Sequence, residues 1–92
     1  MLYPYMKLGD GTEILHTQII EKDGVETVEV HFEKPIETGF KTARCILPSY
    51  EWIIKQNYSD EEIAFFTEFL EHNIKLIFES ARAGGVENAE YF

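Results

Sequence analysis

The longest periodic segment of the chain runs from Ser59 to Ala83 and reads SDEEIAFFTEFLEHNIKLIFESARA. Ser59 and Glu62 have the spacing of a capping box, in which each side chain accepts a hydrogen bond from the backbone N–H of the other residue. Acidic residues fill positions 60–62, at the positive end of a helix dipole, and Arg82 lies in the last turn. Gly84-Gly85 then forms a left-handed stop. These signals predict one long helix over residues 59–83, on which the rest of the chain packs.

This helix carries more apolar residues than one narrow stripe needs. A first set recurs at spacings of three and four and predicts the buried face: Ile63, Phe66, Leu70, Ile74, Ile77 and Ala81. A second set lies partly outside that stripe: Phe65, Phe69, Leu76 and Phe78. The second set either widens the surface that faces the core or forms a separate face that binds a partner helix.

The first half of the chain predicts a four-stranded antiparallel meander. Asp10-Gly11 and Asp23-Gly24 are strong hairpin signals, because a type I′ turn needs positive φ at both central residues. If both are two-residue turns, the two registers agree on one apolar sheet face. That face would hold Leu2, Met6, Leu8, Leu15, Ile19, Val28, Val30 and Phe32.

A longer turn around Pro35 and Gly39 would lead to the fourth strand. Pairing Glu33 with Phe40 places Cys45 on the apolar side and sets Arg44 opposite Glu29, a favourable pair across two strands. A buried free cysteine acts as a small hydrophobic residue, so we do not expect a thiol enzyme.

Ser49 can cap a short helix over Tyr50–Gln56, and Asn57 suits a left-handed turn after it. The predicted fold is therefore a two-layer α+β domain, ββββαα, with a short helix and the long C-terminal helix packed on one face of the sheet. We expect residues 1–83 to form this single domain and residues 84–92 to form a flexible C-terminal tail.

Composition limits the functional classes. The chain has 92 residues and a net charge of −9, which opposes binding to a nucleic-acid backbone. A single cysteine favours a reducing, cytoplasmic location, and no stretch approaches the ~20 apolar residues of a membrane span. Phosphate-binding loops and the HExxH, CxxC and EF-hand spacings are missing, so we expect no cofactor and no motif-defined metal site.

The sheet face away from the helix is the first candidate for a binding surface. The predicted pairing gives it aromatic and charged residues, with His16 and His31 adjacent: Tyr3, Tyr5, His16, Gln18, Glu29, His31 and Arg44. Three interpretations compete. The face is simply solvated, or it is an interface to another protein or a second copy, or its histidines and Glu29 hold a metal ion or transfer protons.

Weighing these observations, we expect a small, soluble, non-enzymatic protein-binding or regulatory domain, with a protein partner or a homodimer and no membrane or nucleic-acid partner. Its candidate surfaces are the outer sheet face and the second apolar set of the helix. One alternative is a small metal-dependent or acid–base enzyme that uses His16, His31 and Glu29. Another is an acidic antitoxin-like or nucleic-acid-mimicking regulator, suggested by nine acidic residues against three basic ones in residues 49–92.

Overall fold

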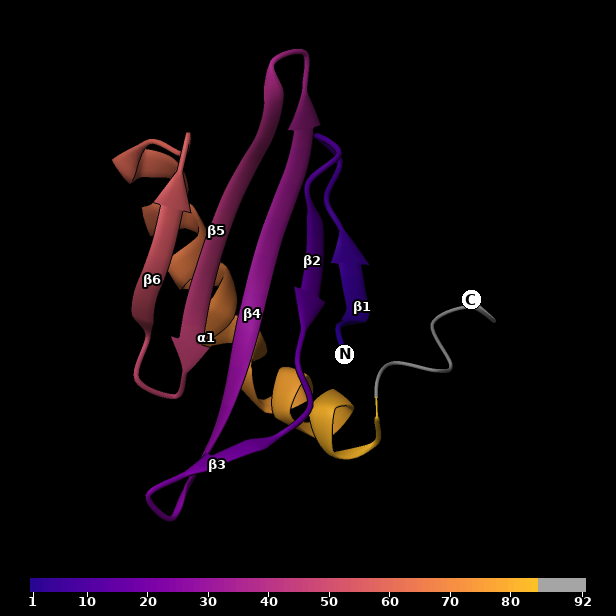
Figure 1. The fold of residues 1–92 in the computed structure, drawn as a ribbon, viewed down its shortest axis with the longest axis vertical. Helices are drawn as coiled ribbons and strands as arrows, with labels where there is room; N and C mark the ends of the chain where they lie inside the picture. Colours follow the sequence, from indigo (N-terminus) through magenta and orange to yellow (C-terminus); the bar gives the residue numbers. More distant parts are fainter. Residues whose placement is uncertain (85–92) are drawn as a thin grey trace.

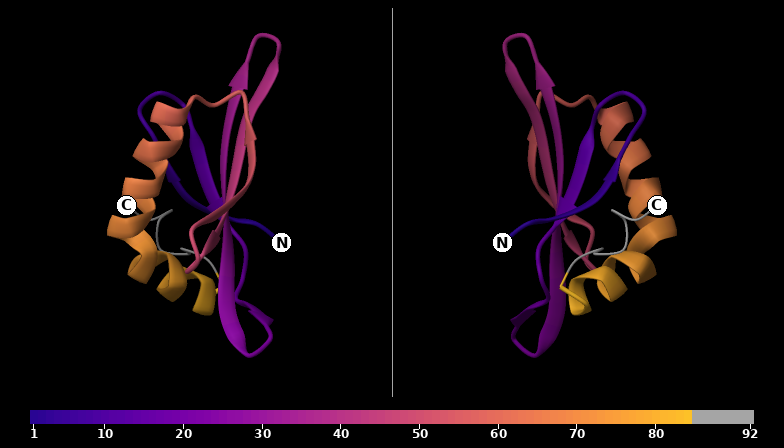
Figure 2. Two further views of the ribbon diagram at one scale, coloured as in Figure 1. Left: turned by 90° about the vertical axis from the view of Figure 1, so that its left-hand side faces the viewer. Right: turned by 90° about the vertical axis from the view of Figure 1, so that its right-hand side faces the viewer.

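A computed structural model describes residues 1–84 of the chain as a small α+β domain with six strands and one helix (Figure 1). The main sheet has the strand order β1-β2-β4-β5-β6, and β3 pairs with the beginning of β4. Helix α1 lies across one face of the sheet, and the side views show it on that side alone (Figure 2). The elements are β1 Tyr3–Lys7, β2 Glu13–His16, β3 Ile20–Lys22, β4 Val25–Ile36, β5 Gly39–Leu47, β6 Glu51–Gln56 and α1 Asp60–Arg82.

The predicted long helix is confirmed, with its termini. The backbone N–H of Glu62 donates to Ser59 Oγ at 3.1 Å, and the N–H of Ser59 donates to Glu62 Oε1 at 3.0 Å. Ala83 is the C-cap, and Gly84 follows with a φ of 80°. Part of the predicted left-handed stop and most of the predicted tail fall on residues 85–92, which lie outside the described residues.

This capping box satisfies two backbone groups that the helix leaves without partners. Its removal should therefore lower the free energy of unfolding by a measurable amount. Replacing Ser59 with alanine should lower the free energy of unfolding by about 1 kcal/mol. Urea unfolding followed by circular dichroism measures the change. Ser49→Ala, at an exposed turn, provides the control and should change stability by less than about 0.5 kcal/mol. Equal effects of the two substitutions would contradict the role of the cap.

Phe32 lies at the centre of the core between the sheet and α1. Its ring stacks on Phe66 with centroids 4.2 Å apart, and Trp52 and Phe69 contact it from the sides. Buried hydrophobic residues from both layers form this core: Ile14, Val28, Val30, Phe32, Ala43, Cys45, Leu47, Phe66, Leu70, Ile77 and Ala81.

The predicted short helix over Tyr50–Gln56 is wrong, because this segment is the edge strand β6. Tyr50 adopts a φ of 59°, so the chain reverses there instead of entering a helix. The adjacent β-branched residues Ile53 and Ile54 favour a strand, and Trp52 reaches α1, where its Nε1 donates to Thr67 Oγ1 at 3.1 Å. The predicted left-handed residue at Asn57 is confirmed, with a φ of 68°.

The second hairpin keeps its predicted register only near its turn. Asp23 and Gly24 have φ values of 51° and 80°, and Lys22 pairs with Val25 as expected. Beyond β3, however, Thr17 bonds twice to Glu29, donating its N–H to the Glu29 carbonyl and accepting the Glu29 N–H on its hydroxyl. The register of β2 against β4 is therefore shifted by one residue, which reverses the two faces of β2.

The other two registers also differ from the prediction. The first turn is longer than two residues, since the Leu8 N–H donates to the Thr12 carbonyl, and β1 contains an irregularity between Pro4 and Met6. The third hairpin turns tightly between Ile36 and Gly39, so β4 and β5 pair two residues away from the predicted register. A shift of two preserves the sheet faces. Cys45 is therefore in the core, as predicted, and Arg44 pairs with His31 instead of Glu29.

Candidate functional site

The sheet face opposite α1 is covered by no other element of residues 1–84, and it faces the viewer in Figure 1. We call it the open face. Strand pairing places one row across it, from Leu15 through His31 and Arg44 to Ile54. Neighbouring rows add further residues from β2, β4, β5 and β6, so that the open face comprises Glu13, Leu15, Glu29, His31, Glu33, Thr42, Arg44, Ile46, Ile54 and Gln56.

His31 is only 6% exposed although no element covers it. Its Nε2 lies 2.8 Å from Glu29 Oε1, which orients the ring along the strand. The neighbouring Arg44 and Glu33 lack such partners. Neither Arg44 nor Glu33 forms an ion pair with a described residue. The buried Nε of Arg44 and the buried Oε2 of Glu33 also have no hydrogen-bond partner within residues 1–84. The open face thus holds a cation and an anion that are not neutralised by direct contacts within residues 1–84.

Several predicted site residues lie elsewhere. Glu29, His31 and Arg44 are on the open face, as predicted. Tyr3, Tyr5 and His16 are not: the one-residue shift of β2 turns His16 toward α1, and the two tyrosine rings pack beside it. Gln18 is exposed in the connection between β2 and β3, outside any strand.

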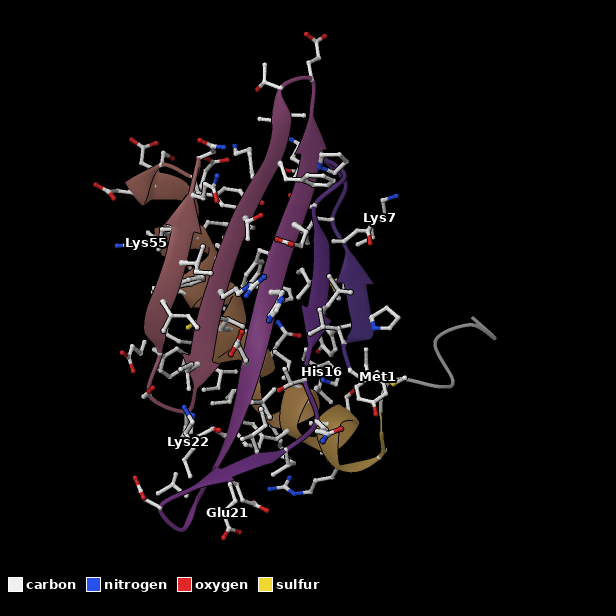
Figure 3. The ribbon with its side chains drawn as sticks, in the orientation of Figure 1. Met1, Lys7, His16, Glu21, Lys22 and Lys55 are labelled. Carbon is white, nitrogen blue, oxygen red and sulfur yellow. The ribbon has the colours of Figure 1, made fainter. Side chains whose placement is uncertain are left out.

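His16 is fully buried where β2 ends beside the C-terminal turns of α1, and Figure 3 labels it there. Its Nδ1 donates to the Thr17 carbonyl at 2.7 Å, because a carbonyl can only accept. Nε2 then accepts the hydroxyl proton of Ser80, also at 2.7 Å. Burial is the main cause that lowers the pKa of His16, opposed by the Thr17 hydrogen bond. No sequence signal points to this pair, because its members are 64 residues apart.

The His16–Ser80 pair has the spacing of a base and a nucleophile, yet its setting is structural. Both side chains are buried. Ser80 lies in the last turn of α1, where the helix carbonyls oppose a developing oxyanion. The predicted combination of His16, His31 and Glu29 is not assembled either, because His16 and His31 lie on opposite sides of the sheet. Within residues 1–84, no three His, Cys, Asp or Glu side chains are grouped closely enough to hold a metal ion.

The second apolar set of the helix divides into two pairs. Phe69 and Phe78 pack against the core, whereas Phe65 and Leu76 are 57% and 56% exposed. Eleven residues are about three turns, so Phe65 and Leu76 lie on the same side of α1. Exposed His72 lies between them, so this side presents separated apolar residues instead of a continuous patch.

Both edges of the sheet carry features that oppose pairing with another strand. On β1, Pro4 lacks an N–H and adjoins the irregularity before Met6. On β6, the pairing with β5 shifts at Ile53. Lysines lie on both edge strands, Lys7 on β1 and Lys55 on β6 (Figure 3). Bulges and lysines are common protection against edge-to-edge association, so the open face is a better binding surface than either edge.

A hollow of about 220 Å³ lies between the first turn of the sheet and the beginning of α1. Two of its three acidic side chains, those of Asp10 and Glu62, already have partners. The pKa of Asp10 is lowered first by the Thr12 N–H and then by Lys34, and the pKa of Glu62 is lowered first by Lys41 and then by the Ser59 N–H. This hollow therefore presents few free ligand groups. It is lined by Leu8, Asp10, Ser59, Glu61, Glu62, Phe65 and Phe66.

Cys45 is buried in the core, and burial together with the charge of Glu51 raises the pKa of its thiol to about 12. Since the thiolate is the reactive form, the folded protein should not react with a thiol reagent such as Ellman's reagent at pH 8 over an hour. In 6 M guanidinium chloride the same thiol should react within minutes. Rapid reaction of the folded protein, at the rate of the unfolded chain, would contradict this assignment.

No family model, curated protein or solved structure matches this chain. Among residues 1–84, α1 falls short of the length of continuous apolar sequence that a membrane-spanning helix requires.

Proposed function

We propose that this chain is a small, non-enzymatic protein-binding domain and that the open face is its contact surface. The observation that carries the proposal is Arg44 beside Glu33, two charged residues that form no ion pair within residues 1–84, on a sheet face that no described element covers. The remaining polar atoms of these two charged groups can receive partners from a docked protein, which would neutralise both charges.

Apolar residues surround these charges, as at the centre of many protein interfaces. Leu15, Ile46 and Ile54 are half-buried on the open face and retain area that a partner could cover. Arginine is enriched in such interfaces, where its planar group forms several hydrogen bonds. The mixture of Arg44 with Glu29 and Glu33 differs from the uniform negative array of a nucleic-acid mimic, so the open face favours a protein.

Two matched variants test the proposal. Leu15→Lys places a lysine on β2 diagonally between Glu29 and Glu33 of β4, which the fold tolerates, and removes an apolar contact from the open face. Leu76→Lys makes the same substitution on the exposed side of α1. Self-association, measured by light scattering, and complexes recovered by crosslinking in the source cell's lysate are compared with those of the wild type. We expect Leu15→Lys to abolish binding and Leu76→Lys to preserve it.

The proposal is overturned if the wild type forms no complex of either kind, or if Leu15→Lys binds as well as the wild type. Circular dichroism at the start of each measurement ensures that a loss of binding is not a loss of folding.

A further inference from the structure

We propose that the occupant of the open face is a second copy of this chain. The two sheets pack face to face about a two-fold axis that runs parallel to the strands, between β4 and β5. This inference rests on the proposed function, since it uses the same surface, and it adds the identity and the orientation of the partner.

The central row of the open face is complementary to itself about this axis. The row runs from Leu15 on β2 through His31 on β4 and Arg44 on β5 to Ile54 on β6. Rotation about an axis between β4 and β5 exchanges the two inner strands and also the two outer strands. Leu15 of one copy then faces Ile54 of the other, and His31 faces Arg44. Each contact occurs twice, as an isologous interface requires.

The charges agree with the same axis. Glu29 and Glu33 flank His31 on β4, two residues away on either side, which is about 7 Å along the strand. An arginine that faces His31 therefore has a carboxylate on each side within reach of its long side chain. The partner copy would supply the groups that Arg44 and Glu33 lack within residues 1–84.

A second possible two-fold axis in the same plane does not bring opposite charges together. A two-fold axis perpendicular to the strands, at the central row, would set Arg44 against its own copy and Glu29 against Glu33 of the other. Like charges at such distances are unfavourable. The arrangement of charges thus distinguishes between two orientations that bury a similar area.

The size of the face predicts a weak, reversible dimer. Four strands at about 4.8 Å spacing, each contributing about 20 Å of length, give about 400 Å² per copy. Stable complexes commonly bury about 800 Å² per partner. We therefore expect dissociation constants in the micromolar range or weaker.

The experiment is sedimentation equilibrium of the full chain from 10 μM to 1 mM, with two charge-reversed variants and their mixture. Arg44→Glu places a third acid against Glu29 and Glu33, and Glu33→Lys places a lysine against Arg44. Each variant alone should dimerise at least tenfold more weakly than the wild type.

An equimolar mixture of the two variants should regain association. The carboxylate introduced by Arg44→Glu in one chain faces the lysine introduced by Glu33→Lys in the other. The unaltered Arg44 of the second chain faces two carboxylates of the first. Such restoration in trans requires folded proteins, so it separates a lost contact from a lost fold.

Leu76→Lys is the control and should dimerise like the wild type. The inference is overturned if the wild type is monomeric at 1 mM, if Arg44→Glu dimerises unchanged, or if the mixture does not regain association. If the wild type is monomeric but Leu15→Lys still abolishes a complex with another protein, the proposed function stands and this inference fails. If a dimer forms that neither Arg44→Glu nor Leu15→Lys weakens, both fail.

Discussion

Replacing Phe32 with alanine should lower the free energy of unfolding by about 3–5 kcal/mol. The Phe32 side chain is fully buried and stacks on Phe66 with ring planes 13° apart, while Trp52 and Phe69 contact its other sides. The surrounding rings belong to both layers, so they cannot close together without moving β6 or α1. The resulting cavity would therefore remain open, which adds the cost of the cavity to the lost burial of the ring.

Phe40→Ala is the matched control, because it removes the same atoms from a ring that is 59% exposed. It should change stability by less than about 1 kcal/mol. Urea unfolding of the three proteins at one pH measures both differences. A small domain has only about 5–15 kcal/mol of stability in total, so Phe32→Ala should unfold at a much lower urea concentration than Phe40→Ala. Similar losses for the two variants would contradict the central role of Phe32.

Local signals explain which parts of the fold could be predicted from the sequence. The helix over residues 60–82 carries its start and stop signals within its own residues, so its prediction is confirmed. The Asp23-Gly24 turn is equally local, and its pairing is confirmed next to the turn. The segment after Ser49 predicts a helix wrongly, because a capping residue and an apolar cluster are compatible with either structure. Its conformation is decided by pairing with β5, which lies outside the segment.

Register determines how well the candidate site can be predicted. A turn fixes register only until the first irregularity, and Thr17 introduces one by bonding to both backbone groups of Glu29. Every residue of β2 beyond that point changes face, which moves His16 into the core. The error of two residues between β4 and β5 leaves Arg44 on the predicted face. Alternation of side chains along a strand therefore tolerates shifts of two and not shifts of one.

Lowering the pH from 7 to 5 should destabilise this protein through His16. Burial lowers the pKa of His16 below its ordinary value of 6.5 in the folded state. Between the two pKa values the unfolded chain binds more protons than the folded chain, so acid favours unfolding. The contribution of neutral His16 is fully present above pH 6.5 and is lost as the pH falls through the lowered pKa. One proton changes the free energy of unfolding by at most about 1.4 kcal/mol per pH unit.

The loss of stability expected between pH 7 and pH 5 does not come from the other groups that contact His16. Ser80 and the Thr17 carbonyl do not titrate, and burial raises the pKa of Tyr5, so its ring stays neutral. Asp10 and Glu62 have pKa values below 3.8 and 4.5, and their stabilising contributions are lost only at lower pH.

Two variants separate the hydrogen bond from the charge. Ser80→Ala leaves the buried Nε2 of His16 without a donor and should cost about 1–3 kcal/mol at pH 7. The double variant His16→Leu/Ser80→Ala removes the buried pair and leaves only the carbonyl of the half-buried Thr17 without its donor, so it should cost less than Ser80→Ala alone. His31 and His72 remain in every protein, so their contributions cancel when urea unfolding is compared at pH 7, 6 and 5. The wild type should lose stability relative to the double variant as the pH falls, because only the wild type must bury a proton acceptor at this position. Parallel curves would show that His16 is not the group that destabilises the folded state in acid.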